Sequence, residues 1–191
     1  MSKHIVDQII NNYKTKKKFY IGEKVTISDH MIQTAMLAEK NHSSKSLTCA
    51  CLLHDYGHFV IEDPDLLVLK SLDGKHEDTG FSFLKDYFKS DVTEPIKLHV
   101  QAKRYLCRNK SYYDLLSDPS KISLELQGGI MGDEEAQKFT SLKFHKDAVI
   151  LRKYDDDGKI PNIKMKSIDD YRDLIASQLI NNKDYLIKFS K

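Results

Sequence analysis

Four histidines recur at nearly equal intervals along the chain. His54 lies 24 residues after His30, His76 follows 22 residues later, and His99 follows after another 23. An interval of this length holds one helix and its connection, so successive antiparallel helices can each bring one histidine to a common point in a bundle core. The spacing therefore predicts a helical bundle with imidazoles gathered inside it.

The scarcity of glycine and proline agrees with a helical chain. The 191 residues include only 8 Gly and 4 Pro, and apolar residues often recur three or four positions apart, which is typical of amphipathic helices. A chain of this length can bury a core of its own. We expect one all-α domain over residues 1–191, with a ligand-bearing core at about 20–160 and a C-terminal packing helix at about 166–188.

Charge and cysteine content exclude several classes of protein. The 30 basic and 28 acidic residues give a net charge of +2, too weak for a general nucleic-acid or membrane-surface binder. Three cysteines without a Cys-x-x-Cys spacing predict neither a disulfide framework nor a cysteine-built zinc site, and they favour a reducing, cytoplasmic location. No apolar run reaches the length of about 18 residues that a membrane span needs. We expect a monomer or weak homodimer that binds a small molecule.

Local patterns predict helix bounds in the first half of the chain. Ser28 or Asp29 is expected to cap the helix that follows, and the next helix is expected over residues 45–56, ending at Gly57. Pro95 suits the first turn of the helix that carries His99.

Turn residues and further helical patterns predict the remaining bounds. Asp73-Gly74 reads as a turn just before a helix that places His76 in its first turn. The helical pattern loosens from Asp118 to Gly129 and resumes as a short helix from Asp133. A further helix is expected to stop at Asp157-Gly158, and a final amphipathic helix is expected over about 168–186.

An adjacent His-Asp pair and a late aspartate add carboxylates to the histidines. Six side chains of this kind exceed what one tetrahedral metal accepts and suit a pair of metals: His30, His54, Asp55, His76, His99 and Asp155. Two such metals need a bridging group, and we expect Asp55, adjacent to another ligand, to supply it. The absence of sulfur ligands favours iron, manganese or another borderline metal over structural zinc.

Two further side chains are expected beside the metals. His58 lies one turn past His54 and could orient a ligand or contact substrate. Lys103 lies one turn past His99 on the same helix face, where it could pair with a substrate phosphate or phosphonate.

These residues resemble the HD-domain superfamily, whose pattern is a histidine, a His-Asp pair and a late aspartate. His76 and His99 resemble its dinuclear branch, which includes phosphohydrolases and mixed-valent diiron oxygenases. The likeness is closest to the small oxygenases that cleave the carbon–phosphorus bond of 1-hydroxyphosphonates. Five stretches carry it: Tyr20-Ile-Gly-Glu23, Leu53-His-Asp-Tyr-Gly-His58, His99-Val-Gln-Ala-Lys-Arg-Tyr-Leu106, Leu124-Glu-Leu-Gln-Gly-Gly129 and Tyr154-Asp155.

The resemblance implies an HD-domain helical bundle with two iron ions in its core, one ferrous and one ferric, and O2 as co-substrate. The six side chains named above would be the iron ligands, with Asp55 as the bridge. The substrate's 1-hydroxyl and a phosphonate oxygen would chelate one iron.

The resemblance also implies roles for other side chains. Lys103 and His58 would hold the phosphonate, with Ser123 and Gln127 in support. The tyrosine that matches Tyr20 can occupy an iron position before substrate arrives and so act as a gate.

The implied function is O2-dependent cleavage of a small 1-hydroxyphosphonate with release of phosphate. The glutamate that matches Glu23 can receive a substrate ammonium, which favours 2-amino-1-hydroxyethylphosphonate, giving glycine, because a buried carboxylate without a cationic partner is costly. Hydroxymethylphosphonate, giving formate, is a close second, and the trimethylammonio analogue stays open.

Two other functions also stay open. One is an HD-type metal-dependent phosphohydrolase that acts on a small phosphate ester or nucleotide. The other is a degenerate HD domain that only senses a ligand.

Overall fold

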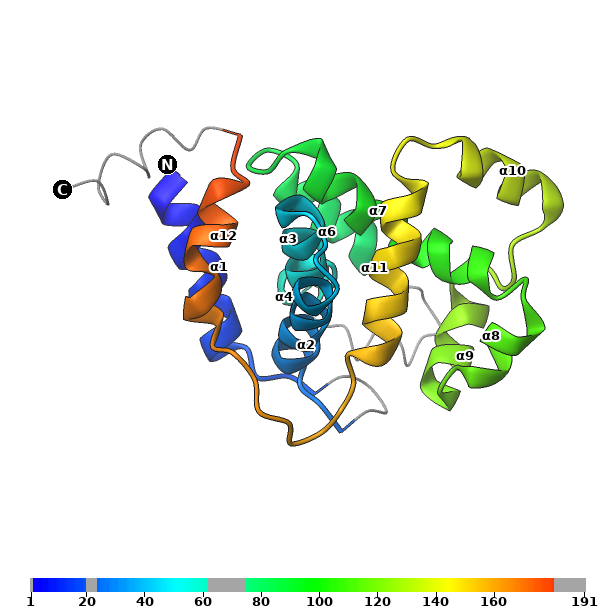
Figure 1. The fold of residues 1–191 in the computed structure, drawn as a ribbon, viewed down its shortest axis with the longest axis horizontal. Helices are drawn as coiled ribbons and strands as arrows, with labels where there is room; N and C mark the ends of the chain where they lie inside the picture. The colour runs from blue at the N-terminus through cyan, green and yellow to red at the C-terminus, as the bar shows by residue number, and fades with distance from the viewer. Residues whose placement is uncertain (1, 20–23, 62–74, 181–191) are drawn as a thin grey trace.

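The computed structural model describes residues 2–19, 24–61 and 75–180, and within these ranges the chain is helical without a β-strand (Figure 1). This confirms the all-α prediction. The α-helices are α1 (Ser2–Thr15), α2 (Ile27–Lys40), α3 (Lys45–Leu53), α4 (Gly57–Val60), α6 (His76–Leu84), α7 (Ser90–Leu106), α8 (Lys110–Leu115), α9 (Asp118–Leu126), α10 (Asp133–Ser141), α11 (His145–Asp157) and α12 (Arg172–Ser177), and a 3-10 helix, η1, spans Ile168–Tyr171.

Four helices form a closed ring at the centre of the fold. Helix α2 packs against α3 and α11, and α7 packs against the same two helices from the other side. Helix α6 packs against α7 and α4. In Figure 1, α1 and α12 flank one side of this ring, and α8, α9 and α10 lie on the opposite side. Buried side chains of the ring helices therefore point toward one another.

The N-terminal helix α1 was not expected from the sequence. Its buried side chains are Ile5, Val6, Ile9, Ile10 and Tyr13, and their spacing of three and four residues is the pattern that would have predicted it. Asn12 donates a hydrogen bond to the Tyr56 hydroxyl at 2.6 Å. Helix α1 thus covers the end of the segment that carries the His-Asp pair.

Two helix starts differ from the prediction. Helix α2 is capped by Thr26, whose hydroxyl accepts from the Asp29 amide at 3.0 Å, while Ser28 is buried and donates to the Tyr13 carbonyl. Helix α7 starts at Ser90, so Pro95 lies inside it and not in its first turn. Proline removes one backbone hydrogen bond there, and the burial of Val92 and Ile96 offsets the loss.

Helix α9 lies where only a loosened pattern was expected. Ser117 caps it by accepting from the Ser120 amide, and Pro119 lies in its first turn. Only Ser120 and Leu124 of this helix are buried. One buried apolar residue produces almost no amphipathic pattern, so the sequence does not predict this helix.

The C-terminal helix is shorter than predicted. In place of a helix over 168–186, the chain forms η1 and α12, and α12 ends at Ser177. The next residues leave the helix because their backbone pairs with the segment before α7: the Lys89 amide donates to the Gln178 carbonyl, and the Ile180 amide donates to the Tyr87 carbonyl. Residues 181–188 lie outside the described part of the chain. The amphipathic pattern of this segment nevertheless agrees with its burial, because four of its side chains at helical spacing are buried: Ile168, Tyr171, Ile175 and Leu179.

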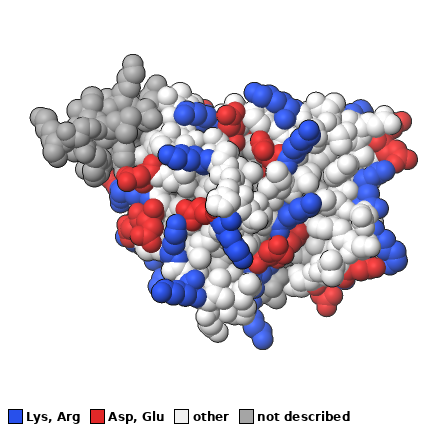
Figure 2. Space-filling model, viewed as in Figure 1, with Lys and Arg blue, Asp and Glu red and all other residues white. Residues whose placement is uncertain are grey.

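Several other bounds agree with the prediction. Helix α6 begins at His76, α10 begins at Asp133, and α11 ends at Asp157 before Gly158. Among the described helices, none combines the length and the apolar character that a membrane crossing requires. Figure 2 shows basic and acidic side chains interspersed over the face seen in Figure 1, as the near-neutral net charge implies.

Candidate metal centre

The structure brings the six predicted ligands together inside the ring of helices. They come from five segments: His30 from α2, His54 and Asp55 from the end of α3, His76 from the start of α6, His99 from α7 and Asp155 from α11. All six are buried, and none is more than 7% exposed. We call these six residues the metal centre.

The metal centre consists of two triads. In the first triad, His30, His54 and Asp155 each offer a ligand atom within 4.8 Å of the other two. Asp55, His76 and His99 form the second triad by the same criterion. The Nε2 atoms of the two histidines are 3.1 Å apart in each triad. The two triads are thus built alike, with two imidazoles and one carboxylate each.

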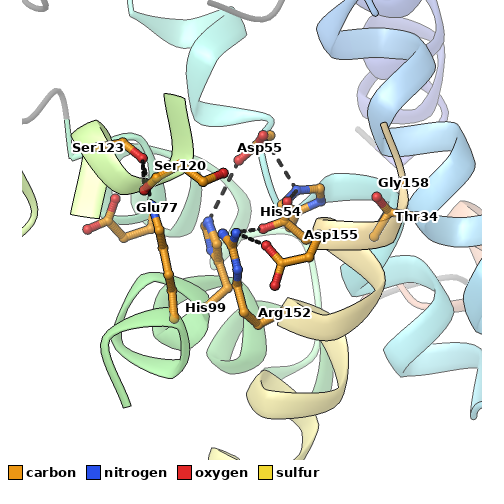
Figure 3. A network of polar contacts seen from close by, with 12 residues as sticks. Thr34, His54, Asp55, Glu77, His99, Ser120, Ser123, Arg152, Asp155 and Gly158 are labelled. Carbon is orange, nitrogen blue, oxygen red and sulfur yellow. Dashed lines mark hydrogen bonds and ion pairs between the residues drawn. The ribbon is translucent and has the colours of Figure 1, made fainter. Parts of the chain in front are cut away.

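Asp55 faces both triads. Its Oδ1 atom lies 3.2 Å from Nε2 of His76 and 3.7 Å from Nε2 of His99. Its Oδ2 atom lies 3.4 Å from Nε2 of His54 and 3.6 Å from Nε2 of His30. Figure 3 shows Asp55 with contacts to His54 on one side and His99 on the other. This is the placement that a bridging carboxylate requires.

Backbone carbonyls orient three of the imidazoles. The Nδ1 atoms of His30, His54 and His99 lie 2.9, 2.9 and 2.6 Å from the carbonyl oxygens of Gly158, Cys51 and Ile96. A carbonyl oxygen only accepts, so each Nδ1 carries the proton and each Nε2 presents a lone pair toward the centre.

Three buried carboxylate oxygens in the metal centre accept no hydrogen bond within the described residues: both oxygens of Asp55 and Oδ1 of Asp155. Burying such an oxygen without compensation costs several kcal/mol per charge. Imidazole lone pairs converge on the same oxygens, and a positive ion in each triad would satisfy both kinds of group. The residues therefore fit a pair of metal ions, and the arrangement is that of a dinuclear metal site.

Metal binding requires ionised carboxylates and neutral imidazoles. Burial alone would lower the pKa of His54, but the Asp55 carboxylate raises it, so a metal ion bound there would displace a proton from this imidazole. Burial alone would raise the pKa of Asp55, but the His54 and His76 imidazoles hold that pKa well below its ordinary value. Burial and the neighbouring His76 lower the pKa of His99 to about 3. At neutral pH, Asp55 is therefore ionised and His99 is neutral.

Arg152 contacts the metal centre and was not predicted from the sequence. Its Nη1 donates to Asp155 Oδ2 at 2.7 Å, as Figure 3 shows. Burial would raise the pKa of Asp155, but the Arg152 guanidinium keeps that pKa well below its ordinary value. The other oxygen, Oδ1, faces His30 Nε2 at 3.2 Å. An Arg-x-x-Asp spacing on one helix is the pattern that could have indicated this pair.

The structure also brings together three side chains predicted to hold the phosphonate. Lys103 is 2% exposed, and its Nζ donates to Ser123 Oγ at 2.6 Å and to Gln127 Oε1 at 3.1 Å. We call these three residues the Lys103 cluster. Burial and the nearby Arg152 charge lower the pKa of Lys103 to about 7. His58 stacks on His76, with ring centroids 4.4 Å apart.

Gly57 begins helix α4, although the sequence suggested that it ends a helix. A Cβ atom at this position would lie 1.9 Å from the carbonyl oxygen of His76 and 2.9 Å from the Gly80 amide nitrogen. Only glycine allows α4 and α6 to approach this closely. The contact holds the first turn of α6, and with it His76, beside Asp55.

Tyr20 and Glu23 lie outside the described residues. The gate role of Tyr20 and the ammonium-binding role of Glu23 therefore stay predictions.

Comparison with protein families decides the membership of the chain. The family model described as HD domain matches residues 27–127, a range that holds five of the six residues of the metal centre. The chain belongs to the HD domain family.

Relatives of this HD domain protein include phosphonate dioxygenases. It is 41% identical over 165 residues to a hydroxymethylphosphonate dioxygenase of Gimesia maris. This match covers 85% of this chain and 82% of the relative. It is 40% identical over 141 residues to a glycine-betaine-forming 1-hydroxy-2-(trimethylamino)ethylphosphonate dioxygenase of Leisingera caerulea, with 73% and 72% covered. An uncharacterized protein of Acanthamoeba polyphaga mimivirus is 35% identical over 178 residues, with 91% and 81% covered. The predicted membership of the HD oxygenase family is confirmed.

Proposed function

We propose that this HD domain protein is an iron-dependent oxygenase that uses O2 to cleave the carbon–phosphorus bond of a small 1-hydroxyphosphonate and releases phosphate. The position of Asp55 between two matched triads carries the proposal, because it provides for two metal ions that share one carboxylate. The dioxygenase names of two relatives that are 40% and 41% identical support the reaction class.

The metal centre would divide its ligands between two ions. His30, His54 and Asp155 would hold one ion, His76 and His99 would hold the other, and Asp55 would contact both. Imidazole and carboxylate ligands without sulfur suit iron, and we propose one ferrous and one ferric ion with O2 as co-substrate. When bound, such a pair supplies a Lewis acid for the substrate hydroxyl and redox chemistry toward O2.

The Lys103 cluster would hold the phosphonate. An ammonium group has three N–H donors, and Lys103 directs two of them to Ser123 and Gln127, so the third is available to a phosphonate oxygen. A phosphonate anion beside Nζ favours the charged form of the lysine and raises its pKa from about 7. Ser123 and Gln127 fix the direction of the ammonium, so the phosphonate is held in one orientation relative to the metal centre.

His58 would contact the phosphonate from the other end of the site. Its ring stacks on His76, and the two planes are inclined by only 13°. Stacking restricts rotation of the His58 side chain, so its ring nitrogens are held beside the second triad. The burial of the six ligands keeps bulk water away from the reacting atoms and strengthens each of these polar contacts.

Two phosphonates are proposed as substrates. The first is 2-amino-1-hydroxyethylphosphonate, giving glycine, because the Glu23 carboxylate could pair with its ammonium group. The second is hydroxymethylphosphonate, giving formate, the substrate named for the relative from Gimesia maris.

Oxygen uptake and phosphate release should be measured on iron-loaded protein with each compound. We expect phosphate release to require O2 and to be accompanied by oxygen uptake. Phosphate release that continues without O2, or from phosphate esters with manganese or magnesium, would indicate a phosphohydrolase.

A cytoplasmic location is also proposed. Cys49, Cys51 and Cys107 are free and buried thiols, which fits a reducing compartment. The prediction of a monomer or weak homodimer is open to sedimentation analysis.

A further inference from the structure

Asp155 is connected to a peripheral helix by a chain of hydrogen bonds. Arg152 Nη1 donates to Asp155 Oδ2, and Arg152 Nη2 donates to Asp156 Oδ1. The hydroxyl of Tyr112, on α8, donates to the other oxygen of Asp156. The side chains of Arg152 and Asp155 are 5% and 2% exposed, and that of Asp156 is 19% exposed. The chain thus runs from near the surface to the metal centre.

The Arg152 guanidinium divides its two terminal nitrogens between two carboxylates. Asp155 and Asp156 lie three and four residues after Arg152 on the same helix. A guanidinium otherwise prefers to bind both oxygens of one carboxylate. Because Asp156 occupies Nη2, Arg152 engages only Oδ2 of Asp155, and Oδ1 is left to face His30 Nε2 at 3.2 Å.

We propose that Asp156, held in place by Tyr112, is a positioning residue that keeps Asp155 Oδ1 directed at the metal pair. It does so by occupying Nη2, one of the two terminal nitrogens of the Arg152 guanidinium. The inference rests on the proposed metal centre. Without Asp156, both terminal nitrogens of Arg152 would bind the two oxygens of Asp155, and Oδ1 would turn away from the first triad. One of the two metal positions would then lose a ligand, while the His76 and His99 position would keep its own.

Tyr112 is suited to its part because its hydroxyl donates to Oδ2 of Asp156 and leaves Oδ1 of Asp156 to Arg152. Burial raises the pKa of its hydroxyl, so the group stays protonated at neutral pH. Asn109 caps α8 by accepting from the Ser111 amide at 2.9 Å, which fixes the start of the helix that carries Tyr112. The aromatic ring thereby sets the direction of the Asp156 carboxylate from a separate element of the fold.

The test compares iron binding by four proteins: wild type, Asp156→Asn, Tyr112→Phe and Tyr113→Phe. Tyr113 is the matched control, because it lies on the same helix and its contact with Lys121 is made by the ring and not by the hydroxyl. Ferrous iron is titrated anaerobically into each full-length protein, and the electron paramagnetic resonance spectrum is recorded after partial oxidation. Circular dichroism checks that each variant is folded.

We expect Asp156→Asn to weaken one of two iron-binding steps roughly tenfold, the size typical of losing a residue that supports a ligand. The other step should be unchanged, and the spectrum of the coupled pair should be altered. Tyr112→Phe, which removes one oxygen atom and is the variant least harmful to folding, should act in the same direction with a smaller effect. Tyr113→Phe should match the wild type.

A double-variant cycle with Arg152→Gln separates positioning from general damage. Since Asp156 acts through Arg152, Asp156→Asn should add no further loss of iron affinity when Arg152 is already replaced. Additive losses would overturn the inference, and so would wild-type iron binding and spectra in both Asp156→Asn and Tyr112→Phe. A wild-type protein that binds no iron would overturn the proposed function and this inference together, whereas two irons bound equally by all variants would overturn only the inference.

Discussion

Asp55 Oδ1 lies 3.2 Å from Nε2 of His76, on the side of the carboxylate opposite to its contacts with the first triad. One side chain therefore faces two separate groups of ligands. The buried oxygens of Asp55 accept no hydrogen bond within the described residues, so both are available to cations at the midpoint of the metal centre.

Asp55→Asn should lower the affinity for both ions, because the amide keeps the shape of the carboxylate but removes its charge. We expect iron affinity to fall by more than about 100-fold, beyond the range found for residues that only support a ligand. Iron at about 100 times its dissociation constant should stabilise the wild type by ~2.7 kcal/mol. Thermal unfolding with and without iron measures this shift, which a chelator should abolish and the variant should lack. An equal shift in the variant would refute the bridging role.

Lys103→Met should impair substrate binding more than metal binding. The substitution keeps most of the side-chain bulk but removes a charged hydrogen bond, worth about 1.5–3 kcal/mol. At 1.36 kcal/mol for each tenfold change, KM should rise roughly 10–100-fold with little change in iron content. Lys97→Met is the matched control, since Lys97 is on the same helix but its ammonium lies over the Phe81 ring. A Lys103 variant with normal KM would exclude contact with the phosphonate.

The Lys103 ammonium should also give a pH dependence. Its pKa is lowered to about 7 by burial and by Arg152, so the free enzyme loses this charge as the pH rises through 7. The pH profile of kcat/KM reports ionisation in the free enzyme, and we expect kcat/KM of the wild type to fall as the pH rises through about 7. This fall in kcat/KM should be missing in Lys103→Met, and a fall that persists in the variant would show that another group titrates there.

Gly57→Ala should damage the second triad through the backbone. The new methyl group would lie 1.9 Å from the His76 carbonyl oxygen, and overpacking of this kind costs about 1–3 kcal/mol or more. Denaturant unfolding should show that loss, and iron titration should show weaker binding at one position. Gly132→Ala is the control, because nothing lies within 4 Å of its added methyl group. Gly132 is the N-cap of α10, and we expect this substitution to lower the free energy of unfolding by about 1 kcal/mol or less.

The sequence revealed the metal centre better than the parts of the fold around it. His30, His54, His76 and His99 were visible because α2, the end of α3, α6 and α7 each contribute one histidine at a regular interval. The missed helix α9 has a single buried apolar residue, Leu124, so its sequence shows no amphipathic pattern.

The side chains that support the ligands were missed for a different reason. Arg152 and Asp156 look like an ordinary charged pair on a helix surface, whereas the fold buries Arg152 and leaves Asp156 19% exposed. Tyr112 contacts Asp156 across 44 residues of sequence, a distance that no local pattern bridges. The close approach of Gly57 to His76 is likewise a contact between two helices, and a glycine in isolation reads as a helix end.

The most direct test of the central claim is electron paramagnetic resonance on iron-loaded protein, combined with metal analysis, before and after addition of each candidate phosphonate. We expect two irons per chain and a coupled ferrous–ferric signal that changes when the phosphonate binds. One metal per chain, or a signal that neither phosphonate alters, would contradict the proposal that Asp55 joins two irons in a phosphonate oxygenase.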